Sequence, residues 1–181
     1  MKSINDYKPG DIILVSNNGL LPKGIKLFMN IYRKKKDVSK TELYNHVVVV
    51  VNLWGKMWIA DSAEKGVQVN ESLEKYVNRE NCLHLTWKTP LTEEEQELFS
   101  KTAINYSLNP TRYDFINFYD QIRYILTGKW KGKTGDKSKK RLYCSEFAAV
   151  CMNVVRNSFN GVTWDKNPLD IQLCEDLVVV E

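Results

Sequence analysis

The distribution of apolar residues along the chain predicts a mixture of strands and helices. Apolar runs without polar alternation indicate two buried strands, Ile12–Val15 and Asn45–Leu53. The second run contains five consecutive valines, which implies burial on both faces of a sheet. Trp54-Gly55 then forms a turn, and Met57–Ser62 returns as the second strand of a hairpin. Further short strands are expected at Val67–Val69, Cys82–Trp87 and Leu177–Val180.

Helical spacing of apolar residues marks the remaining elements. Thr92, followed by Glu95 three positions later, forms a capping box that opens a helix ending near Tyr106. Other helices are expected at Ile25–Tyr32, Leu73–Val77, Tyr113–Leu126 and Ser145–Val155, with turns at Lys8–Asp11, Asn17–Gly19 and Asn167-Pro168. The order strand, helix, sheet, helices, strand is an α+β pattern. It predicts a small antiparallel sheet packed against helices.

Composition places the chain among ordinary globular proteins. Its 181 residues are 43% hydrophobic and 27% charged, and residues 1–181 are interpreted as one domain. No apolar run is long enough to span a bilayer. The start of the chain carries no secretory signal, so we expect a cytoplasmic protein, or one released without a signal peptide.

Positive charge is concentrated in one segment. The formal net charge of +4 does not by itself imply a nucleic-acid partner, and none is expected. The stretch Lys129–Arg141 carries seven basic residues against the single Asp136, and 128–141 is interpreted as a basic surface loop. Two readings stay open for this loop. It is either a solvated segment or a weak contact for anionic substrate, lipid or polymer.

The cysteines show no metal-binding spacing. The four residues Cys82, Cys144, Cys151 and Cys174 form no CxxC or similar motif. Cys82 and His84 share a strand face, but no further ligand lies nearby to complete a metal site. We therefore expect no metal, no cofactor and reduced thiols.

A hairpin register brings one histidine to a carboxylate. The sequence contains only two histidines, so a cysteine hydrolase would have few possible bases. If Trp54-Gly55 are the central residues of the turn, Val48 pairs with Asp61. His46 and Asp61 are then diagonal neighbours on one face, because same-face residues are two apart along a strand. Asp61 would hold one ring nitrogen of His46 and leave the other for a proton.

Cys144 stands just before the predicted helix Ser145–Val155. A thiol there is exposed to the positive end of the helix dipole, which favours the thiolate, and the amides of Cys144 or Ser145 are possible oxyanion donors. Each of the three residues also has a purely structural explanation. Cys144 can be a small core residue, His46 a satisfied polar residue and Asp61 the end of a strand.

An ordered set of short motifs resembles a known family. The chain is similar to permuted NlpC-type, papain-like hydrolases, the YiiX-like group in particular. The matching pieces are Pro9–Leu14, Asn45–Val50, Trp58–Ser62, Gly66-Val67, Tyr113–Phe115, Tyr143–Phe147 and Pro168–Ile171. In this group the histidine precedes the cysteine, as it does here.

The resemblance implies a permuted papain-like fold with its nucleophile at a helix N-terminus. It makes Cys144 the nucleophile, His46 the base and Asp61 the polar partner, a position that is often Glu in this group. Ser145, Tyr113 and Tyr143 are candidate substrate or oxyanion residues by their place in the motifs.

The function favoured by the sequence is that of a cysteine peptidase or amidase. It would cleave amide bonds through an acyl-enzyme, in short peptides of cell-wall type. One alternative is a lipid acyltransferase or thioesterase with the same chemistry, and another is a non-catalytic binding domain, because fold does not fix function. The expected partner is a peptide or acyl small molecule, and the oligomeric state stays open.

Overall fold

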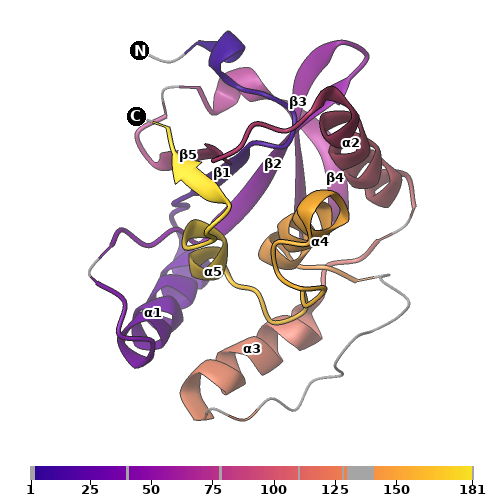
Figure 1. Ribbon diagram of the computed structural model, residues 1–181. Helices are drawn as coiled ribbons and strands as arrows, with labels where there is room; N and C mark the ends of the chain where they lie inside the picture. Colours follow the sequence, from indigo (N-terminus) through magenta and orange to yellow (C-terminus); the bar gives the residue numbers. More distant parts are fainter. Residues whose placement is uncertain are drawn as a thin grey trace.

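A six-stranded antiparallel sheet organises the chain into an α+β fold (Figure 1). The computed structural model describes residues 3–39, 41–77, 79–109, 111–127, 129 and 141–180, and only the backbone of 70, 71 and 116–118. The strands are β1 (Ile12–Val15), β2 (His46–Leu53), β3 (Lys56–Ala63), β4 (Gly66–Ser72), β5 (Cys82–Trp87) and β6 (Leu177–Val179). They lie in the order β4-β3-β2-β1-β5-β6.

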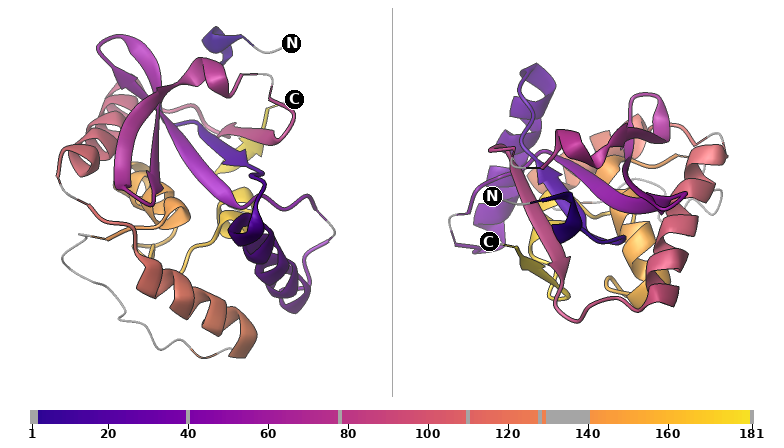
Figure 2. Two further views of the ribbon diagram at one scale, coloured as in Figure 1. Left: turned by 180° about the vertical axis from the view of Figure 1, so that it is seen from behind. Right: turned by 90° about the horizontal axis from the view of Figure 1, so that it is seen from above.

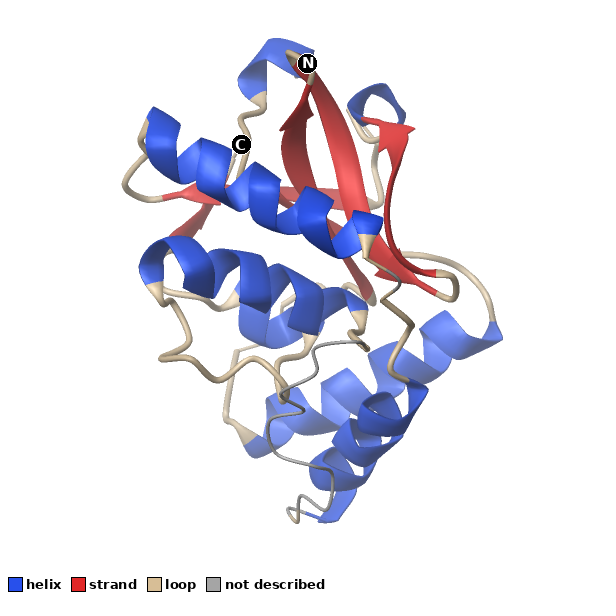
Figure 3. Ribbon diagram, turned by 90° about the vertical axis from the view of Figure 1, so that its right-hand side faces the viewer, coloured by secondary structure: helices blue, strands red, loops and turns tan. Residues whose placement is uncertain are grey.

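Helices cover one face of this sheet and extend beyond it. The helices are η1 (Ile4–Asp6), α1 (Leu20–Lys35), η2 (Leu73–Lys75), α2 (Glu93–Leu108), α3 (Phe115–Thr127), α4 (Cys144–Arg156) and α5 (Pro168–Gln172). Helices α2 and α4 pack side by side on the sheet (Figure 3). Helices α1 and α3 pack against each other at the lower end of the molecule in Figure 1.

Strand β2 is the centre of the core. All five valines of Val47–Val51 are fully buried, as predicted from the uninterrupted apolar run. The odd-numbered valines belong to the cluster that contains Phe99 of α2 and Phe147 of α4. The even-numbered valines pack on the other face with Tyr7 and Leu73. That second face, seen from behind in Figure 2, is covered by shorter segments.

The β2–β3 hairpin has the predicted register. Leu53 pairs with Lys56 and Val48 pairs with Asp61. Trp54 and Gly55 have φ angles of 53° and 76°, the left-handed values that a two-residue type I′ turn requires at both positions. The local turn therefore sets which side chains of the two strands share a face.

Helices α1 and α5 differ most from the prediction. Helix α1 begins at Leu20 rather than Ile25, because Pro22 lies in the first turn, where a backbone N–H has no partner in the helix to lose. The turn predicted at Asn167-Pro168 is wrong. Asn167 caps α5 by accepting from the amides of Leu169 and Asp170, and Pro168 is the first residue of this helix.

Two further expectations concern the surface. The loop predicted at 128–141 lies outside the described residues, except for Lys129 and Arg141. Of the helices that the structure describes, none combines the length and the apolar character needed to cross a bilayer.

Candidate active site

His46 and Asp61 meet where β2 and β3 separate. The Nε2 atom of His46 lies 3.0 Å from Oδ2 of Asp61, and the two side chains are 17% and 18% exposed. The paired part of the hairpin ends at Val48 and Asp61. Because Nε2 is occupied by the carboxylate, Nδ1 is the ring nitrogen left for another partner.

That partner is Cys144, the first residue of α4. Cys144 is 7% exposed, and its sulfur lies close enough to the His46 ring for the two side chains to interact electrostatically. The backbone amides of Val47 and Ser145 also lie near the sulfur and favour its thiolate form. Ser62 fixes the approach of α4, because its hydroxyl donates to the carbonyl of Leu142, two residues before Cys144, at 2.6 Å.

His46 and Cys144 each favour the charged form of the other. Burial lowers the pKa of His46, but the charge of the Cys144 thiolate and hydrogen bonds with Asp61 and Cys144 outweigh burial and raise that pKa to about 10. Burial raises the pKa of Cys144, but the charge and hydrogen bond of His46 and the two amides hold it below its ordinary value of 9.0. A thiolate–imidazolium pair is the resting state that these shifts favour.

The other three thiols have the opposite character. Burial raises the pKa of the Cys82, Cys151 and Cys174 thiols. Cys151 is fully buried and Cys174 is 8% exposed, as expected for core residues. The contrast with Cys144 comes from its neighbours and not from its burial, since Cys144 is also buried.

The candidate oxyanion residues play different parts. Ser145 contributes its backbone amide, because its hydroxyl donates to the carbonyl of Lys166 at 2.8 Å. The hydroxyl of Tyr143 donates to the carbonyl of Trp164 at 2.7 Å, so only its ring faces the site. Burial and the negative charge of Cys144 raise the pKa of Tyr113 above 10.0, which keeps its hydroxyl protonated and able to donate.

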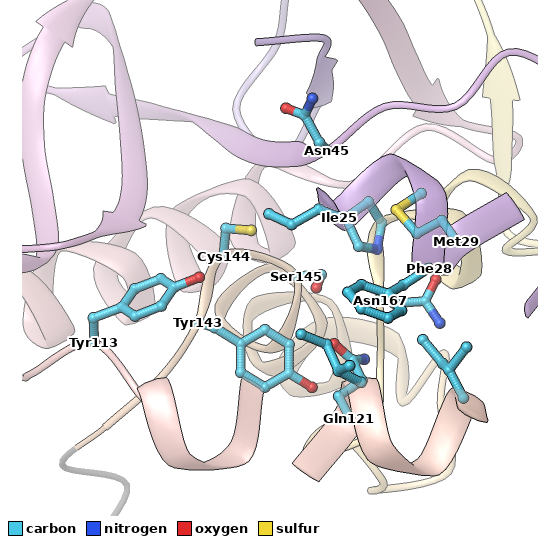
Figure 4. A pocket seen from close by; sticks show the side chains of 13 residues that line it. Ile25, Phe28, Met29, Asn45, Tyr113, Gln121, Tyr143, Cys144, Ser145 and Asn167 are labelled. Atoms are coloured by element: carbon cyan, nitrogen blue, oxygen red, sulfur yellow. The ribbon is translucent and has the colours of Figure 1, made fainter. Parts of the chain in front are cut away.

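An apolar slot leads away from the thiol. It runs between α1 and α3, and Figure 4 shows the side chains that line it. Its walls are Ile25, Phe28 and Met29 from α1, Gln121, Ile122 and Ile125 from α3, with Asn45, Tyr113, Tyr143, Cys144, Ser145, Asn167 and Pro168. The slot is narrow, about 20 Å³, so a chain that entered it would have to move the two helices apart. No sequence pattern indicated this slot directly, since its walls come from distant segments.

A second histidine–carboxylate pair lies apart from the site. His84 on β5 places Nε2 at 2.8 Å from Oδ2 of Asp11, and both side chains are 2% exposed. Thr86 donates to the other carboxylate oxygen at 2.7 Å, and the ring of Tyr7 stacks on His84 with centroids 4.1 Å apart. The sequence analysis placed Asp11 in a turn and in the motif Pro9–Leu14, and it gave this residue no partner. The sequence feature that could have indicated this pairing is an acidic residue directly before a buried strand.

Comparisons with known proteins inform the fold. The sequence matches no family model and no curated protein. The structure is similar to a crystal structure of the metalloprotein yiiX from Escherichia coli O157:H7, with a TM-score of 0.60 and 14% sequence identity. The match covers 96% of each chain. The chain therefore has a distant YiiX-like fold, and this likeness carries no activity with it.

That neighbour is a metalloprotein, but the residues that this structure describes do not group into a metal site. Within the described ranges, no three His, Cys, Asp or Glu side chains are grouped so that they could hold a metal ion. His46, Asp61 and Cys144 are not such a group, although Asp61 and Cys144 both interact with the His46 ring. The donor set around His46 therefore does not fit a metal centre.

Proposed function

We propose that the protein is a cysteine hydrolase of the permuted NlpC-type, papain-like kind, which forms an acyl-enzyme on Cys144. The observation that carries this proposal is the chain of contacts from Asp61 through His46 to Cys144, with the thiol at the start of a helix. The YiiX-like fold and the order of histidine before cysteine support it.

Each residue of the site has a defined role in the proposed reaction. The Cys144 thiolate attacks the carbonyl carbon, while the helix amide of Ser145 and the Tyr113 hydroxyl donate to the developing oxyanion. The carbon–nitrogen bond then breaks, and the leaving nitrogen takes the proton of the His46 imidazolium. Water attacks the thioester and gives a proton to His46, and the thiolate is released. Attack on the carbonyl removes the thiolate charge that raises the pKa of His46, so the imidazolium then gives up its proton more readily.

The bond cleaved is proposed to be an amide in a short peptide of cell-wall type. The apolar slot favours a second candidate, a thioesterase or acyltransferase that holds a lipid acyl chain between α1 and α3. Both candidates use the same acyl-enzyme. They differ in the group that leaves.

Labelling with iodoacetamide tests the shared chemistry. Cys144 should be alkylated faster than the other three thiols at neutral pH, because only its pKa is lowered. His46→Ala should slow this labelling, and Cys174→Ala, a buried thiol outside the site, should not. Faster labelling of Cys82, Cys151 or Cys174 in the folded protein would reject Cys144 as nucleophile.

Matched substrates then separate the candidates. Acyl amides and acyl thioesters with the same acyl group should both be hydrolysed by an amidase, and only the thioesters by a thioesterase. Cys144→Ala and His46→Ala should each reduce turnover by at least about a thousandfold, because nucleophile and base act as a unit. Turnover that survives Cys144→Ala would show that the site lies elsewhere.

A further inference from the structure

A basic cavity opens beside the proposed catalytic residues. Its volume is about 460 Å³, and its walls are Glu64 and Lys65 at the β3–β4 turn, Arg112, Tyr113, Phe115 and Arg141. Three of these side chains are cationic and one is a carboxylate. The sequence analysis noted the charge near Arg141, but nothing in the sequence indicated that Lys65 or Arg112 lies beside it.

The backbone holds the two arginines next to each other. Arg112 and Arg141 form a parallel bridge, and the amide of Leu142 donates to the carbonyl of Arg112 at 3.0 Å. The β3–β4 turn is fixed against the same segment, because Gly66 approaches Thr111 so closely that an added Cβ would lie 1.6 Å from its carbonyl oxygen. Three separate stretches of chain therefore converge to build the cavity.

The cations of this cavity have no acidic partners in the part of the chain that the structure describes. Lys65, Arg112 and Arg141 make no ion pair there, and Glu64 is the one carboxylate among the lining residues. Adjacent like charges repel unless an anion lies between them. Guanidinium groups are also suited to bind a carboxylate through two parallel hydrogen bonds.

The cavity is next to the nucleophile. Tyr113 lines both this cavity and the apolar slot that contains Cys144. Arg141 precedes Cys144 by three residues, so their Cα atoms are at most about 11 Å apart. A molecule whose carbonyl reaches Cys144 can therefore extend past Tyr113 into the cavity.

We propose that this cavity binds a carboxylate of the peptide substrate, so that the enzyme prefers short peptides with a free carboxylate over neutral ones. The proposal rests on the proposed function, since it assigns the substrate of the same site. Lys65, Arg112 and Arg141 attract and orient the carboxylate, and the apolar slot lies on the other side of Tyr113.

Two alkylating reagents of similar size test this assignment without a known substrate. Iodoacetate carries a carboxylate and iodoacetamide does not, so the ratio of their rates at Cys144 reports the field near the thiol. The ratio cancels changes in thiol reactivity that affect both reagents. Arg112→Gln/Arg141→Gln should lower it about fourfold at low ionic strength, which is the effect of removing two charges about 10 Å away in water. Lys65→Gln should lower the ratio by a smaller factor.

The control is a double variant that loses two positive charges at positions away from the cavity. Lys56→Gln/Lys101→Gln removes two cations, one at the tip of the β2–β3 hairpin and one in an exposed pair on α2, and should leave the ratio unchanged. An equal fall in both double variants, or no fall in either, overturns the proposal. So does protection of Cys144 by inorganic phosphate at lower concentration than by acetate, which would assign the cavity to phosphate. A different result would be slow labelling of Cys144 by iodoacetamide at a rate that does not change in His46→Ala. That result would reject the proposed function itself.

Discussion

Asp61→Asn should lower the pKa of His46 while preserving the shape of the site. The substituted side-chain amide would retain an oxygen near Nε2 but lose the negative charge that favours the imidazolium. A hydrogen bond to a charged group contributes about 2 kcal/mol, and one pKa unit corresponds to about 1.4 kcal/mol. The pKa of His46 should therefore fall by about 1.5 units from its value of about 10 in the native protein.

The pKa of Cys144 should rise in the same variant. The thiolate is stabilised by a protonated His46, so a weaker imidazolium leaves the thiol less acidic. The pH at which alkylation of Cys144 reaches half its maximum should consequently rise in Asp61→Asn. Both changes come from one missing charge and should appear together.

Proton NMR of the histidine rings measures the first change directly. The chain contains two histidines, so the spectrum of His46→Ala assigns both signals. Asp37→Asn, at an exposed position, serves as a control with the same loss of charge. If the pKa of His46 falls by less than about half a unit, which is about 0.7 kcal/mol, Asp61 is not the group that holds the imidazolium.

Two further predictions concern the framework around the site. His84→Ala should lower the free energy of unfolding by about 2 kcal/mol, because it removes the His84 hydrogen bond to the buried Asp11 carboxylate and leaves the bonds from Thr86 and the amide of Lys8. Cys144 in the folded protein should still be alkylated at the native rate. Urea unfolding and peptide mapping measure the two effects, and a loss of Cys144 reactivity would place His84 in the site. Gly66→Ala should destabilise the protein by at least about 1 kcal/mol more than Gly55→Ala. Both glycines have positive φ, but only Gly66 meets backbone, so equal destabilisation in thermal unfolding would contradict the close approach to Thr111.

Local features were predictable from the sequence because short-range physics decides them. The Trp54-Gly55 turn fixed the register of the hairpin, and the register placed Asp61 diagonal to His46. The five valines predicted burial on both faces of β2, and the capping box at Thr92 is present. Each of these depends on residues within one or two adjacent elements.

Contacts between distant segments were not predictable in the same way. The slot needs α1 and α3 to pack together, and the basic cavity needs Arg112, Arg141 and Lys65 to converge from three stretches. The pairing of His84 with Asp11 joins residues 73 positions apart. Periodicity shows which face of an element is apolar, but not which other element covers it.

The dipeptide Asp61-Ser62 explains why the two halves of the site meet. Neighbouring residues on a strand point to opposite sides, so one residue can serve the hairpin and the next can serve another element. Asp61 holds the His46 ring within the hairpin, and Ser62 donates to the carbonyl of Leu142, 80 residues later in the chain. This second bond fixes the start of α4, and with it Cys144, against the end of β2 where the amide of Val47 meets the sulfur. A pattern that marks Asp61-Ser62 as the end of a strand is therefore correct about the local structure, but it does not reveal the long-range bond that brings Cys144 to His46.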